Sequence, residues 1–123
     1  MEPNPILILQ TSAVILAISA VGGATMAGMR FSGRAYPPTW LAMLHGFLSA
    51  AALTLLIFAW CTVGLPTLAA AAVVLFVAAA LGGVVMNLNF HWKQLPLPKW
   101  LVLVHASIGV IGFLLLLAAV FGH

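Results

Sequence analysis

Two histidines occupy equivalent places in two apolar stretches of the sequence. Residues 37–50 read PPTWLAMLHGFLSA and residues 97–110 read LPKWLVLVHASIGV, so His45 and His105 follow a Pro-x-Trp group at the same spacing. A neutral imidazole is a common ligand for transition-metal ions and for haem iron. Both histidines could therefore coordinate one metal centre, provided that the fold brings their rings together.

The elements that must position these rings are set by a strongly apolar composition. Of the 123 residues, 65% are hydrophobic and only 4% are charged, which excludes an ordinary soluble domain. Four apolar stretches, at about residues 6–29, 39–62, 66–88 and 98–121, are each long enough to cross a bilayer as a helix. They lack the alternation of a lipid-facing barrel strand. The sequence therefore predicts an all-α, four-helix transmembrane bundle.

The few charged residues predict how this bundle is oriented. The basic side chains lie in, or at the end of, the two loops after the first and third apolar stretches, and Glu2 is the only acidic residue; the basic residues are Arg30, Arg34, Lys93 and Lys99. By the positive-inside rule, both basic loops face the cytoplasm and both termini face the opposite side. We expect an integral protein of a bacterial inner membrane. The positive net charge comes from these two loops and is explained by the orientation of the protein in the membrane, so no nucleic-acid partner is expected.

An internal repeat relates the two halves of the chain. The pair Gly22-Gly23 recurs 60 residues later as Gly82-Gly83, and Met26 recurs as Met86, with the same offset as the two histidines. The chain is therefore interpreted as one membrane domain made of two units, residues 1–63 and 64–123. Each unit has an even number of helices, so both units enter the membrane in the same direction and their symmetry axis runs along the membrane normal.

The repeat also predicts where the histidines lie. Pro38 and Pro98 suit the first turn of a helix, and each histidine follows seven residues later, about 10 Å deeper in the membrane. Gly22 lies eight residues before Arg30, at about 12 Å depth from the same surface. In a square bundle the second and fourth helices are diagonal. The two imidazoles should then face each other at the level of the glycine pairs.

Two opposed imidazoles favour one haem b with His45 and His105 as its metal ligands, because the glycine pairs 22–23 and 82–83 leave the first and third helices without bulky side chains at that level. Gly46 and Gly109 would add room for the macrocycle beside the histidines, and Met26 and Met86 could either pack on it or ligate the iron. The basic side chains could pair with the haem carboxylates; these are Arg30, Arg34, Lys93 and Lys99. The only cysteine is Cys61, so covalent attachment through a CxxCH motif is excluded.

Other interpretations of the same residues stay open. The histidines could bond to neighbouring helices, and the glycine pairs could be packing faces against a helix or a second protomer, as in a homo-oligomer. His45, His105, Met26 and Met86 form a soft ligand set suited to Cu(I). A haem-handling or sensing protein with one labile ligand, or a cofactor-free scaffold, would also fit. His91 and His123 are expected to be solvated at opposite membrane surfaces, without a second haem.

With these residues in place, the chain resembles four-helix transmembrane b-type cytochromes, including the b561-like and superoxide-oxidase-like quinone-linked proteins. At residue level the resemblance covers His45 and His105 as axial ligands. It implies electron transfer, with a membrane quinone or a redox partner protein. Those relatives often carry two haems on four membrane histidines, whereas this sequence offers two ligands. Only His91 could serve quinone protonation, so the sequence leaves enzymatic turnover undecided and assigns no catalytic residue.

Overall fold

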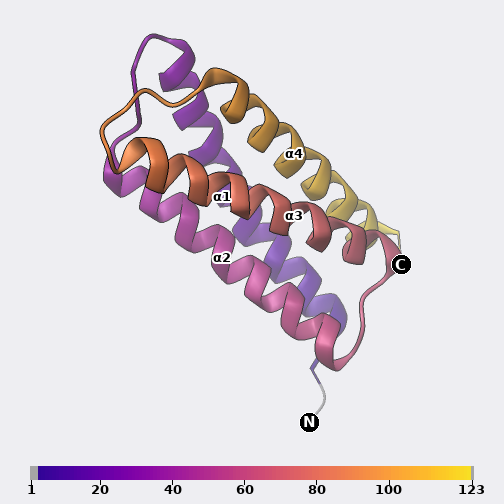
Figure 1. The fold of residues 1–123 in the computed structure, drawn as a ribbon. Helices are drawn as coiled ribbons and strands as arrows, with labels where there is room; N and C mark the ends of the chain where they lie inside the picture. The colour runs from indigo at the N-terminus through magenta and orange to yellow at the C-terminus, as the bar shows by residue number, and fades with distance from the viewer. Residues whose placement is uncertain (1–2, 123) are drawn as a thin grey trace.

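The computed structural model describes residues 3–122 and consists of four long helices (Figure 1). They are α1 (Pro5–Phe31), α2 (Thr39–Thr62), α3 (Thr67–Met86) and α4 (Lys99–Phe121). A five-residue π-helix, η1 (Asn87–His91), extends α3, and no strand occurs within the described range. All four helices are long and apolar enough to cross a membrane. The predicted all-α, four-helix membrane bundle is confirmed.

Local signals explain where the helices begin. The Asn4 side chain accepts a hydrogen bond from the Leu7 backbone N–H and caps α1. Each of the other three long helices begins directly after a proline, Pro38, Pro66 or Pro98. These prolines have extended backbone, so Pro38 and Pro98 precede the first turn rather than lie in it. Their fixed φ still gives each helix a defined start.

The helices form two hairpins that pack side by side. α1 lies along α2, α3 lies along α4, and α1–α4 and α2–α3 contacts join the hairpins. α2 and α4 are therefore on one diagonal of a square, as predicted. The connections 32–38 and 92–98 lie at one end of the bundle, and the α2–α3 connection lies at the other (Figure 1). We call the first of these ends the basic end, because it carries Arg30, Arg34, Lys93 and Lys99.

The tightly packed core occupies the half of the bundle away from the basic end. Leu56 and Leu116, which are equivalent in the repeat, are both 0% exposed. Small alanines around them let the helices approach closely. The cluster consists of Leu9, Ala13, Leu56, Ala69, Ala72, Val73, Phe76, Leu116, Ala119 and Val120. In the other half, His45, His105 and both glycine pairs are half-buried.

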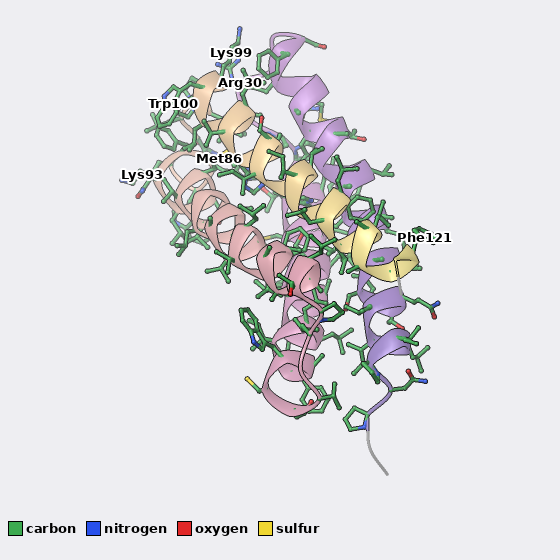
Figure 2. All side chains as sticks on the ribbon, turned by 90° about the vertical axis from the view of Figure 1, so that its right-hand side faces the viewer. Arg30, Met86, Lys93, Lys99, Trp100 and Phe121 are labelled. Carbon is green, nitrogen blue, oxygen red and sulfur yellow. The ribbon has the colours of Figure 1, made fainter. Side chains whose placement is uncertain are left out.

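Contacts between α1, α4 and the two connections hold the basic end together. Arg30 lies in the last turn of α1, and its Nε donates a hydrogen bond to the Leu97 carbonyl at 2.8 Å. The Leu97 N–H in turn donates to the Ala35 carbonyl at 3.0 Å, which joins the two connections. Lys99 begins α4, and its ammonium lies 5.7 Å from the Phe31 ring centroid. Figure 2 shows Arg30, Lys93 and Lys99 at this end, opposite Phe121.

Candidate metal or haem site

The two histidines meet across the diagonal of the bundle. The ring centroids of His45, on α2, and His105, on α4, are 6.1 Å apart, and the ring planes are inclined at 74°. No backbone contact between α2 and α4 is needed for this meeting, because the rings themselves span the gap. The structure thus brings together the two residues on which the sequence analysis centred.

Both imidazoles are oriented by the same kind of hydrogen bond. His45 Nδ1 lies 2.8 Å from the Ser19 carbonyl oxygen, and His105 Nδ1 lies 2.7 Å from the Ala79 carbonyl oxygen. A carbonyl oxygen can only accept, so each Nδ1–H donates, and in the neutral ring Nε2 keeps its lone pair. Metal-binding histidines almost always donate their other N–H in this way. In both rings Nε2 is therefore the nitrogen that stays available to a metal.

The separation of the rings matches the space that one metal ion occupies. A metal–imidazole bond is about 2 Å long and a ring nitrogen lies about 1 Å from its centroid, so two imidazoles in line on one metal have centroids about 6 Å apart. The observed distance is 6.1 Å. The inclined planes are no obstacle, because each ring can take any rotation about its own metal–nitrogen bond.

Each imidazole ring packs against a glycine pair of the preceding helix, and we call this contact surface the glycine seat. A Cβ on Gly23 would lie 2.9 Å from Cε1 of His45, and one on Gly83 would lie 3.3 Å from Cε1 of His105. Each of these glycines follows the accepting carbonyl by four residues, so its missing side chain exposes that carbonyl to the ring of the next helix. Gly22 and Gly82 lie beside the same rings. That the glycines also clear space for a macrocycle remains a prediction.

Serine hydroxyls support only one of the two rings. Ser19 Oγ lies 3.0 Å from His45 Nδ1, donates to the His45 carbonyl at 3.1 Å and lies 2.6 Å from Ser49 Oγ. Ser19 is 2% exposed. The equivalent positions in the second unit are Ala79 and Gly109. Sequence reasoning missed Ser19 as a partner of His45; the signal was a hydroxyl four residues before the second glycine of the pair.

The remaining predicted site residues are spread over the same half of the bundle. Met26 and Met86 are half-buried, and Figure 2 shows Met86 on the α3 side near the basic end. Gly46 is exposed and Gly109 half-buried, each with open space where a Cβ would lie. The side chains of Arg34, Lys93 and Lys99 are exposed.

The prediction that His91 is solvated is wrong. His91 is 9% exposed, and its ring centroid lies 5.5 Å from that of Tyr36. Two features bury it: α3 continues past Met86 as the π-helix η1, and the connection 32–38 places Tyr36 against the ring. His123 lies outside the described residues.

The arrangement brings two imidazole rings together, and each donates its Nδ1–H to a helix carbonyl, which leaves Nε2 as the remaining ring nitrogen. Within residues 3–122, no group of three or more His, Cys, Asp or Glu side chains could hold a metal ion. No protein-family model, curated protein or solved structure significantly matches the chain, so its own geometry is what indicates its chemistry.

Proposed function

We propose that the chain is a membrane haem b protein in which His45 and His105 are the axial ligands of one haem. The observation that carries this proposal is the pair of opposed imidazoles 6.1 Å apart, each with Nδ1–H committed to a helix carbonyl. Two protein ligands suffice for a haem, because the porphyrin supplies the other four nitrogens. A bare ion would find these two nitrogens and would need further ligands, for which the sequence offers the sulfurs of Met26 and Met86.

When bound between two histidines, haem supplies reversible one-electron transfer. The protein would fix the ligand tautomers through the carbonyl oxygens of Ser19 and Ala79, and its apolar helices would surround the site. Among residues 3–122 the basic side chains have no acidic partner, so those of Arg34, Lys93 and Lys99 are free to neutralise the haem carboxylates. A lipid-soluble quinone is the electron partner that a chain made almost entirely of membrane helices can reach.

The test is an absorption spectrum of the detergent-purified protein, oxidised and then reduced with dithionite. We expect a Soret band, sharp reduced α and β bands, and about one haem per chain by pyridine haemochrome assay. A colourless protein that gains no spectrum with added haemin would contradict the proposal. If such a protein instead bound Cu(I) in a manner dependent on Met26 and Met86, the copper interpretation would replace it.

We also propose that the basic end faces the cytoplasm of a bacterial inner membrane. Cys61, the only cysteine, is exposed in the last turn of α2 at the opposite end. A membrane-impermeant maleimide should therefore label the wild-type protein in intact spheroplasts.

The matched control moves the thiol to the other end of the bundle. A Cys61→Ser/Ser32→Cys variant places it in the connection after α1, where residue 32 is exposed. This variant should be labelled only after permeabilisation. Labelling of both proteins from outside, or the reverse pattern, would refute the orientation.

A further inference from the structure

The two imidazoles are held with different strength, although the repeat places them symmetrically. In both units Nδ1 donates to a carbonyl 26 residues earlier in the chain. The first unit adds the hydroxyls of Ser19 and Ser49, and the second unit has Ala79 and Gly109 in their places. The difference lies entirely in the side chains around the ring, because the main-chain contact is the same.

The His45 ring is locked by a buried network. Ser19 Oγ donates to the His45 carbonyl, which leaves its lone pairs to accept from the Ser49 hydroxyl and to share the Nδ1–H of His45. Gly23 adds a close backbone contact, because even a Cβ there would come within 2.9 Å of the ring. Swinging this ring away would leave the 2%-exposed Ser19 hydroxyl with fewer partners, and unsatisfied buried polar groups are costly.

The His105 ring has a looser seat. Its hydrogen bonding consists of the single contact with the Ala79 carbonyl at 2.7 Å. Gly83 leaves more room, with its ideal Cβ position 3.3 Å from Cε1. One turn further along α4, a Cβ on Gly109 would meet nothing within 4 Å. Moving this ring therefore breaks one hydrogen bond and leaves no buried hydroxyl without its partner.

We propose that His105 is the exchangeable axial ligand, and that a small neutral molecule such as carbon monoxide binds in its place while His45 stays bound. This inference rests on the proposed haem function. With a reduced haem bound, Nε2 of His105 would give up its bond and keep its lone pair, and the carbon atom of carbon monoxide would supply a lone pair in its place. No electron or proton is taken from another reactant. The half-buried, uncharged surroundings of His105 favour a neutral ligand over an anion.

The first experiment compares His45→Ala with His105→Ala. His105→Ala should retain haem through His45, show a five-coordinate spectrum and bind carbon monoxide at least about tenfold faster than the wild type. His45→Ala should bind haemin at least about tenfold more weakly than His105→Ala. Equal haem retention by the two variants, or stronger retention by His45→Ala, would overturn the inference.

The second experiment exchanges the hydroxyls between the units and keeps both histidines. Ala79→Ser/Gly109→Ser gives His105 the surroundings of His45 and should slow carbon monoxide binding to the reduced protein about tenfold. The matched variant Ser19→Ala/Ser49→Gly gives His45 the surroundings of His105 and should not slow it. Identical rates in the wild type and both variants would overturn the inference, even if the single histidine variants fail to fold.

Failure of this inference and failure of the haem proposal give different results. A wild-type protein without a Soret band contradicts the haem proposal and, with it, the assignment of His105 as an exchangeable ligand. A wild-type protein with the six-coordinate spectrum that takes up no carbon monoxide contradicts only the assignment of His105 as exchangeable.

Discussion

Replacing both His45 and His105 with alanine is expected to abolish haem binding while the four helices still form. His45 and His105 are the two histidine rings that meet across the diagonal of the bundle, and within residues 3–122 no group of three or more His, Cys, Asp or Glu side chains offers another metal site. The packed core lies in the other half of the bundle and does not include either histidine. The Soret absorbance per protein should therefore fall to background, whereas far-ultraviolet circular dichroism should keep its helical signal.

His91→Ala is the matched control for this result. It also removes an imidazole from the same half of the bundle, but this ring is buried and packs against Tyr36 rather than against the other two histidines. The His91→Ala protein should keep about one haem per chain and the wild-type α and β bands. A double His45/His105 variant that still binds stoichiometric haem would show that the ligands lie elsewhere.

Gly23→Val is expected to weaken haem binding strongly, although it replaces neither of the two proposed ligands. A Cβ at residue 23 would lie 2.9 Å from His45 Cε1 and 3.3 Å from Nδ1, and the two valine methyl groups need still more room. The imidazole must then leave the Ser19 carbonyl that fixes its orientation. Loss of such a partner typically lowers metal affinity about 10–100-fold, which haemin titration of the detergent-solubilised protein would measure.

Gly28→Val separates this effect from the general cost of a β-branched residue in α1. Gly28 belongs to the same helix, and a Cβ there would meet nothing within 4 Å. Both variants lose helical glycine flexibility and gain the same side chain, so their helix-propensity effects are similar. Equal haemin affinities for Gly23→Val and Gly28→Val would contradict the role assigned to the glycine seat.

The sequence was sufficient to predict the bundle and the meeting of the histidines. The lengths of the apolar stretches limit each element to a membrane helix, and the 60-residue offset places His45 and His105 at equivalent depths. Diagonal placement of α2 and α4 then requires only that consecutive helices are neighbours. These inferences depend on length and periodicity, which are directly visible in a single sequence.

The contacts of the rings could not be predicted in the same way. The acceptors of both Nδ1–H groups are main-chain carbonyls, and every residue has a carbonyl, so no residue type marks Ser19 or Ala79 as a partner. The choice depends on the rotation of α1 against α2 and of α3 against α4. The burial of His91 likewise depends on a π-helix and on the path of a distant connection, for which the sequence offers no simple periodic signal.

The use of main-chain oxygens as acceptors has a consequence for how the two halves could diverge. Substitutions at residues 19 and 79 change a side chain but leave the carbonyl in place, so the geometry of each imidazole survives mutational drift there. After a duplication, such positions could accumulate different polarities without loss of the shared architecture. Two copies of one hairpin could thus acquire chemically distinct tasks around a common centre while the histidines and glycines stayed fixed.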